Sequence, residues 1–368
     1  MLTNHTHRTE RGQTPKNGER RTEGGYLSPA VRQLSAVLRF DLIRLLGVTL
    51  VVFALMSILN PGRFLTYRNF ASMCFQFPEL GILSLAVMIA LITGGIDLSI
   101  IGVANLAGLS AAFVLARVEA GDPVGLHIVI AVSLALGVSV LCGILNGWLI
   151  GFVGITPILA TLGTMQLFTG VAFVLTRGHA VAGYPEAFQA LGNGTGLYVP
   201  LPLVVFLACA LAVQLILTRT TLGLRLCLTG TNPTAAVFAG INVPRLQLKT
   251  YVVSGLLAGI AGLLIIARTN SAKADYGSSY LLQAVLVAIL AGVDPRGGFG
   301  TAWGILLAVL ALQFLSSGLN MLHFHELAGP YINNFTKEFT WGSLLLLVMV
   351  INRRNRRVPS PGLRRSVA

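Results

Sequence analysis

Long, continuously apolar stretches separated by short polar ones make up most of the chain. A helix needs about 20 apolar residues to cross a hydrocarbon core about 30 Å thick, so these stretches predict membrane-spanning helices. Ten candidate spans follow, with approximate bounds 43–60, 78–94, 98–117, 126–150, 157–176, 198–218, 248–268, 280–293, 300–319 and 331–351. The runs are continuous, whereas strands of a membrane barrel alternate apolar and polar residues. They are also longer than the buried strands of a soluble core, which span about 4–8 residues.

Two of the predicted spans are interrupted by glycine or proline. The second ends in the sequence TGGIDLS, residues 93–99, and the short eighth runs into AGVDPRGG, residues 291–298. Interrupted apolar segments are typical of broken helices beside a transport path. An ordinary tight turn, with Asp97 or Asp294 capping the next helix, is an equally good interpretation.

Composition supports a membrane protein and suggests three segments. Of the 368 residues, 54% are hydrophobic and 11% are charged, against about 25% charged in soluble domains. We therefore predict an all-α integral membrane protein, a bundle of about ten transmembrane helices in residues 41–352. Residues 1–40 read as a disordered, basic tail, with no cleavable signal peptide, and residues 353–368 as a second basic tail.

The distribution of basic residues predicts the orientation. Most of the 26 Lys and Arg residues lie in the two tails and in the loop 219–247. The positive-inside rule then places both termini and this loop in the cytoplasm and the loop 177–197 outside. The net charge of +13 is explained by an anionic membrane surface, without nucleic acid.

Catalytic and metal-binding patterns are absent from the sequence. It has no P-loop, so it is not expected to bind ATP itself, and no nucleophile triad or carboxylate pair stands out. The four cysteines fit neither a zinc pattern nor a disulfide framework. The cluster His323-Phe324-His325-Glu326 lacks the i, i+4 spacing of a helical zinc site. We predict a transport subunit, not an enzyme, with no cofactor or metal.

Polar residues inside the spans are nearly all uncharged. Asp97 lies at the end of a span and Glu79 at an outer edge, so no internal acidic relay for an ion-coupled carrier is evident. Amides and hydroxyls inside spans either line a path for a polar, uncharged solute or join helices by hydrogen bonds. The candidate path residues are Asp97, Asn105, Asn146, Thr161, Gln166 and Gln283, and Gln214 and Gln313 also lie within spans.

The inner loop 219–247 is long enough to carry a docking helix. Asn232 is positioned to cap a short helix with Pro233 at its first position, and Gly240 to stop it after about two turns. Small residues permit close approach to a partner, and Phe238 is the large apolar anchor among them. The candidate coupling residues are Asn232, Thr234, Ala235, Ala236, Phe238 and Gly240.

This loop resembles the cytoplasmic coupling loop of ATP-binding-cassette importer permeases of the ribose/xylose/branched-chain class. Residues 230–243 read GTNPTAAVFAGINV, against an approximate family pattern G-N-x-E-A-A-x-x-x-G-I-N-V. Similar family segments are GGIDLS at 94–99, the Asn146-Gly147 pair, the stretch 157–165 and GGFGT at 297–301. Together they cover about residues 45–351. The family often has Glu before the Ala pair, where this chain has Thr234, so a charge contact to the ATPase is missing there or comes from Arg225 or Arg245.

The resemblance implies a permease subunit in a bacterial inner membrane that imports a monosaccharide-like, ribose-type solute. Its implied partners are cytoplasmic ATPase subunits that bind the ATP, a periplasmic sugar-binding protein, and a second permease subunit in a homo- or heterodimer. The alternatives are an importer for another small polar solute, such as a branched amino acid or nucleoside, and an ion-coupled secondary carrier.

Overall fold

A computed structural model describes residues 29–119, 121–196, 199–321, 339 and 342–343, with side chains from Leu42 onward. The chain divides into two units, Met1–Phe40 and Asp41–Ala368. The helices that pack on one another belong to the second unit. Outside the described residues lie the predicted span 331–351 apart from residues 339 and 342–343, the histidine cluster at 323–326, most of the first predicted tail and all of the second.

Nine apolar helices account for most of the described residues. They are α1 (Pro29–Leu59), α2 (Tyr67–Ile92), α3 (Ile100–Leu115), α4 (Val124–Trp148), α5 (Pro157–Thr176), α7 (Leu201–Arg219), α10 (Val243–Thr269), α11 (Tyr280–Leu290) and α12 (Ala302–Met321). A π-helical turn, Leu149–Val153, extends α4. Within the described part, seven helices are long and apolar enough to cross a membrane, and α3 and α11 are shorter apolar helices.

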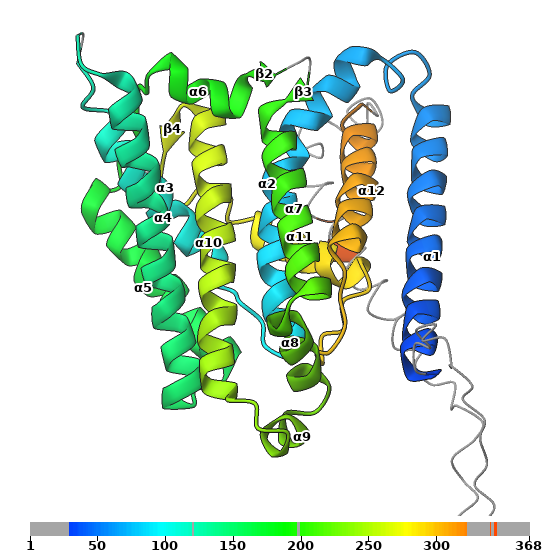
Figure 1. Cartoon of the computed structure of the whole chain (residues 1–368). Coiled ribbons are helices and arrows are strands. Elements are labelled where there is room, and N and C mark those ends of the chain that lie inside the picture. The colour runs from blue at the N-terminus through cyan, green and yellow to red at the C-terminus, as the bar shows by residue number, and fades with distance from the viewer. Residues whose placement is uncertain (1–28, 120, 197–198, 322–338, 340–341, 344–368) are drawn as a thin grey trace, which may run out of the picture. The chain divides into compact units, whose positions relative to one another are not determined.

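Short elements lie at the two ends of these helices (Figure 1). One end carries α6 (Glu186–Asn193) and two antiparallel strand pairs, β1 (Val181–Ala182) with β4 (Ser271–Ala272) and β2 (Thr195–Gly196) with β3 (Val199–Pro200). Val181 lies opposite Ala272, and Thr195 opposite Pro200. The other end carries α8 (Thr221–Thr231) and α9 (Pro233–Phe238). We refer to these as the α6 end and the α9 end.

Helices α2 and α10 form the centre of the second unit. Their apolar windows are 89% and 78% buried, against 28% for α4, α5 and α7. The outer helices instead expose Leu, Ile and Val side chains, as expected where lipid is the solvent. Small residues bring α10 against α4: a Cβ at Gly255 would lie 2.6 Å from the Ser139 carbonyl oxygen. Such close approach of backbones is typical of packing between membrane helices.

Two helices begin earlier than the sequence pattern predicts. α2 begins at Tyr67, not near 78, because Thr66 caps it by accepting a hydrogen bond from the Asn69 backbone at 3.3 Å. Met73 and Phe77 then bury apolar side chains in this added stretch, and Pro78 is accommodated inside the helix. α1 begins at Pro29, within the segment 1–40 that was expected to be disordered. Proline at a helix start loses no hydrogen bond.

The two interruptions predicted from glycine and proline are present. α2 ends at Ile92 and α3 begins at Ile100, so residues 93–99 form a break between two helices. α11 ends at Leu290, and residues 291–301 lead to α12 without a helix. Each break contains glycines in the left-handed region, such as Gly94 at φ +83°.

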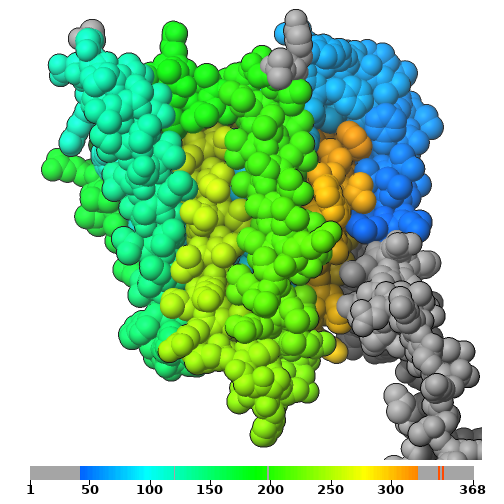
Figure 2. Space-filling model, in the orientation of Figure 1, coloured from blue at the N-terminus to red at the C-terminus, as the bar shows by residue number. Residues whose placement is uncertain are grey.

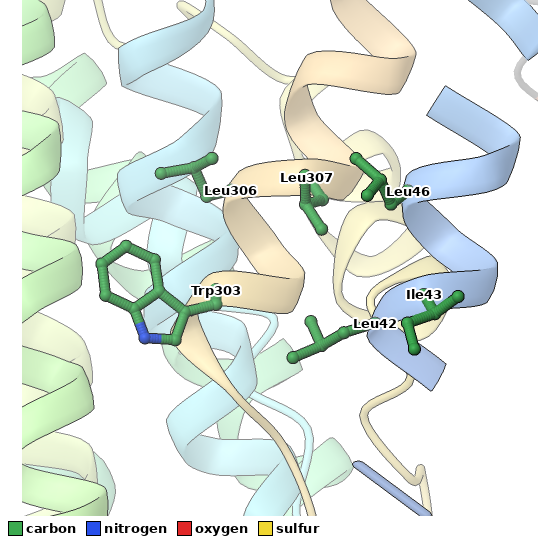
Figure 3. A pocket seen from close by; sticks show the side chains of 6 residues that line it. All are labelled: Leu42, Ile43, Leu46, Trp303, Leu306 and Leu307. Atoms are coloured by element: carbon green, nitrogen blue, oxygen red, sulfur yellow. The ribbon is translucent and has the colours of Figure 1, made fainter. Parts of the chain in front are cut away.

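An apolar groove lies between the middle of α1 and the start of α12 (Figure 3). It is lined by Leu42, Ile43, Leu46, Trp303, Leu306 and Leu307. This lining offers almost no hydrogen-bonding group, so the groove does not suit a polar solute.

Candidate functional site: a polar network at the helix break and an exposed helical loop

A buried carboxylate anchors the break between α2 and α3. Asp97 is 1% exposed. Its Oδ1 accepts hydrogen bonds from the Ser99 backbone N–H at 3.0 Å and from the Ser99 hydroxyl at 2.7 Å. Its Oδ2 accepts one from the Ser254 hydroxyl of α10 at 2.7 Å. Asp97 thus ties the break to α10.

Asn146 of α4 extends this network to α5. Its Nδ2 donates to the Ser99 hydroxyl at 2.7 Å, and its Oδ1 accepts from the Thr164 hydroxyl at 2.6 Å. Thr161, one turn before Thr164, donates to the Ile96 carbonyl at 3.2 Å and to the carbonyl of Pro157 at 2.8 Å. Three of the predicted path residues, Asp97, Asn146 and Thr161, are therefore brought together. We call Asp97, Ser99, Asn146, Thr161, Thr164 and Ser254 the polar network.

The other three predicted path residues lie elsewhere. The Nδ2 of Asn105 on α3 donates to the carbonyls of Ala274 and Tyr276, at 3.0 and 2.9 Å, and fixes the segment after β4. Gln166 is exposed on α5, and Gln283 is half-buried on α11. All six candidates lie within or at the end of predicted spans, so their positions in the sequence do not distinguish these three from the three in the polar network.

The predicted cap at Asp97 is wrong in its details. Ser99 is the N-cap residue of α3 and its side chain makes no capping bond. Asp97 instead accepts from the backbone two residues on, which is an Asx turn. The carboxylate holds the break together and does not cap the helix.

Two buried hydroxyls have no hydrogen-bond partner among the described side chains, those of Tyr251 and Thr229. The Tyr251 hydroxyl lies against the break, since a Cβ at Gly95 would come within 2.7 Å of it. Gln247, Tyr251 and Ser254 of α10, at i, i+4 and i+7 spacing, thus all meet residues 93–97.

An ion pair near the α6 end was not foreseen from the sequence. Arg268 lies in the last turn of α10. Its Nε is 2.6 Å from Glu79 Oε1 and its Nη2 is 2.9 Å from Oε2. Glu79, expected at the outer edge of a span, is buried. This bidentate pair joins the two central helices.

The loop 219–247 contains two short helices where one was expected. Thr220 caps α8 by accepting from the Gly223 N–H at 3.3 Å. As predicted, Asn232 caps α9, with its Oδ1 accepting from the Ala235 N–H at 3.0 Å, and Pro233 is the first helical residue. Gly240 follows at φ +77°.

The tip of this loop is an exposed apolar surface. Figure 2 shows the α8–α9 segment projecting beyond the neighbouring helices. Phe238 is 87% exposed and Val237 is 60% exposed, whereas Ala236 is buried. Within the residues that the structure describes, no group of three His, Cys, Asp or Glu side chains is placed to hold a metal ion.

Comparisons with known proteins identify the family. Residues 69–351 match the model for the family described as "Branched-chain amino acid transport system / permease component". The chain is 34% identical over 281 residues to "Autoinducer 2 import system permease protein LsrD" of Yersinia enterocolitica, covering 75% of this chain and 80% of that protein. It is 32% identical over 311 residues to the proteins of that name from Yersinia pseudotuberculosis and Yersinia pestis, covering 83% of this chain and 89% of each relative.

The family match spans the helix break, the polar network and the two-helix loop. The family match, the similar permeases and the seven long apolar helices together confirm the resemblance drawn from the sequence motifs. The chain belongs to this permease family, and it is a multi-pass inner-membrane permease subunit of an ATP-binding-cassette importer of the sugar-type class.

Proposed function

We propose that the solute is a sugar or a sugar-like signalling molecule, with autoinducer 2 as the first to test. The observation that carries the proposal is the similarity to autoinducer 2 import permeases over 75–83% of the chain. The chemistry of the break is compatible with it. Apart from Asp97, the polar network is built from hydroxyls and an amide, which both donate and accept as sugar hydroxyls require.

Gln166 of α5 is the best candidate for a side chain that faces the path. It is exposed, and its neighbours Leu162 and Leu167 are exposed apolar residues. A primary amide gains nothing from contact with lipid tails, because no partner there satisfies its donors. We infer that this part of α5 meets water in the path or the second permease subunit. In this arrangement Asp97, Asn146 and Thr161 do not contact the solute but fix the positions of the helices behind Gln166.

ATP is bound by partner ATPase subunits, and the α8–α9 segment is their docking surface. The exposed pair Val237 and Phe238 supports this role. An exposed aromatic side chain on a small-residue helix is suited to fill a pocket in a partner, and buried aromatic anchors dominate interface energy. The loop and both termini are cytoplasmic in this proposal, and the α6 end faces the substrate-binding protein. About ten spans follow when residues 331–351 supply the last one.

Transport by the complete importer tests the proposal. Proteoliposomes would hold this chain with its ATPase and second permease subunits, and the binding protein would be added outside. We expect ATP-dependent accumulation of autoinducer 2 or a pentose, and none of a branched-chain amino acid or nucleoside. Accumulation of an amino acid or nucleoside alone would replace the proposed solute class. Solute-driven proton uptake by this chain alone would point to the ion-coupled carrier.

A further inference from the structure

Three chain segments meet backbone to backbone near the α9 end. They are the end of α2, the end of α8 and the segment 294–300 before α12. The Gly298 N–H donates to the Ile92 carbonyl at 2.8 Å. Gly230 of α8 lies directly against the same two groups, so that a Cβ there would collide with the Ile92 oxygen and the Gly298 nitrogen. We call Gly94, Gly230, Gly297 and Gly298 the glycine junction.

The four residues of the junction have no side chains, and the branched, stiff side chain of Thr231 lies against Gly298. A Cβ at Gly297 would lie 2.8 Å from both Gly230 Cα and Gly94 N. Gly297 and Gly298 also have φ values of +97° and +95°, which disfavour any residue with a Cβ. Movement of one segment therefore acts on the backbone of the next without being taken up by flexible side chains.

The contact made by α8 at this place depends on shape more than on side-chain hydrogen bonds. The hydroxyl of Thr229, the residue before Gly230, is buried and has no hydrogen-bond partner among the residues that the structure describes. A buried hydroxyl without a partner costs free energy. If α8 packs differently at this place, the Thr229 hydroxyl therefore has no hydrogen bond to lose.

The junction lies between the two parts of the proposed machinery. On one side α8 leads through Asn232 to α9 and its exposed tip. On the other side only residues 93–96 separate Ile92 from Asp97, which binds Ser254 of α10 and, through Ser99, Asn146 of α4. This is a continuous chain of packed groups from the docking surface to the polar network, of the kind that carries energetic coupling between two sites.

We propose that the glycine junction transmits movement of the α8–α9 docking loop to the helix break at 93–99, and so sets the state of the polar network. This inference rests on the proposed docking role of the loop. A competing route runs directly from α9 into the first turn of α10 and bypasses the junction. A Cβ added at Gly230 would disturb the route through the junction and leave the route through α10 intact, so it distinguishes the two.

The test measures whether nucleotide changes the break when the junction is altered. Leu98, half-buried in the break, is replaced by cysteine in a variant without the four native cysteines. The rate of its reaction with a maleimide is measured in the assembled importer with and without a nonhydrolysable ATP analogue. With the native junction we expect the analogue to change this rate.

Gly230→Ala should abolish the analogue-dependent change and lower uptake roughly 2- to 30-fold, the range expected for mutations along a coupling network. Co-purification with the ATPase should be retained, because α9 is untouched. Gly300→Ala is a milder variant, since its Cβ would press on the Ile92 side chain at 3.1 Å, and a smaller effect in the same direction is expected. Gly137→Ala on α4, with no atom within 4 Å of the added Cβ, is the matched control and should behave as the native chain.

Three results would overturn the inference. The first is an unchanged analogue response in Gly230→Ala, which would favour the route through α10. The second is loss of the ATPase from both Gly230→Ala and Gly300→Ala, which would give the junction a role only in holding the docking loop. The third is an importer with the native junction that transports with ATP, but in which the analogue does not change the reaction rate of the cysteine at position 98. An importer that neither holds the ATPase nor transports would instead contradict the proposed function.

Discussion

The Glu79–Arg268 pair predicts how much stability is lost when either residue is substituted, because the two side chains differ in exposure. Arg268 is 28% exposed and Glu79 is 1% exposed. Removing one member of a buried pair costs about 3–5 kcal/mol, because a charge is left without a partner in a poor solvent. A charge that reaches water loses much less, about 1 kcal/mol or below. The pair should therefore respond asymmetrically to substitution.

We expect Arg268→Gln to destabilise the protein by about 3–5 kcal/mol, since Glu79 is then left buried and unpaired. Glu79→Gln should cost about 1 kcal/mol, because the Arg268 guanidinium can turn toward water. The double variant has no buried charge and should be more stable than Arg268→Gln alone. The assay is the fraction of detergent-solubilised protein that remains monodisperse after heating. A Glu79→Gln variant as damaged as Arg268→Gln, or strictly additive losses in the double variant, would refute this reasoning.

Four further predictions concern the docking loop, the helix break, the orientation in the membrane and the reactivity of Cys227. Phe238→Ala should release the ATPase subunits while the chain stays folded, and normal co-purification and uptake would remove α9 as the docking helix. Asp97→Ala leaves three donors unpaired at about 1–3 kcal/mol each and should lower uptake roughly tenfold or more. Asp97→Asn, which keeps two of the acceptor contacts, should lose less, and equal losses would count against a hydrogen-bonding role. A cysteine at Gln189 in a cysteine-free background should react with an impermeant reagent in intact cells, whereas labelling only after permeabilisation would reverse the orientation. Burial raises the pKa of the Cys227 thiol, so it should react with maleimide at neutral pH more slowly than a cysteine at the exposed Leu228, and faster as pH rises; equal rates would contradict the burial.

Two features set by local sequence were predicted correctly, whereas the local cap at Asp97 was wrong and α8 was missed. The Asn232 cap depends on residues three apart, and the break after Ile92 depends on two adjacent glycines. Long apolar runs also place most of the helices, because a membrane core sets their length independently of the partners they meet. The start of α2 was misplaced because Tyr67–Phe77 is only partly apolar, and packing against α1 and α12 does not appear in a hydropathy window.

Features set by long-range contact were missed. Glu79 and Arg268 are 189 residues apart, and each alone reads as an edge charge. Ser254 and Thr164 join the network through their hydroxyls, but in the sequence they are indistinguishable from other small residues of a membrane helix. The only local signal was the spacing of Thr161 and Thr164, which places both on one face of α5. Asn105, Gln166 and Gln283 were predicted as path residues together with Asn146, because every polar residue within a span was treated alike.

The position of α10 suggests how a change at the break would spread. Its first half meets the break through Gln247, Tyr251 and Ser254, and its last turn carries Arg268. Between these points the α10 backbone lies directly on α4, where Gly255 leaves no room for a side chain. A helix held so closely along its length moves with its neighbour more readily than it bends, since close-packed surfaces are not continuously deformable. Movement of residues 93–97 should therefore displace α10 together with α4 and reach the ion pair at the α6 end, where the binding protein is proposed to dock.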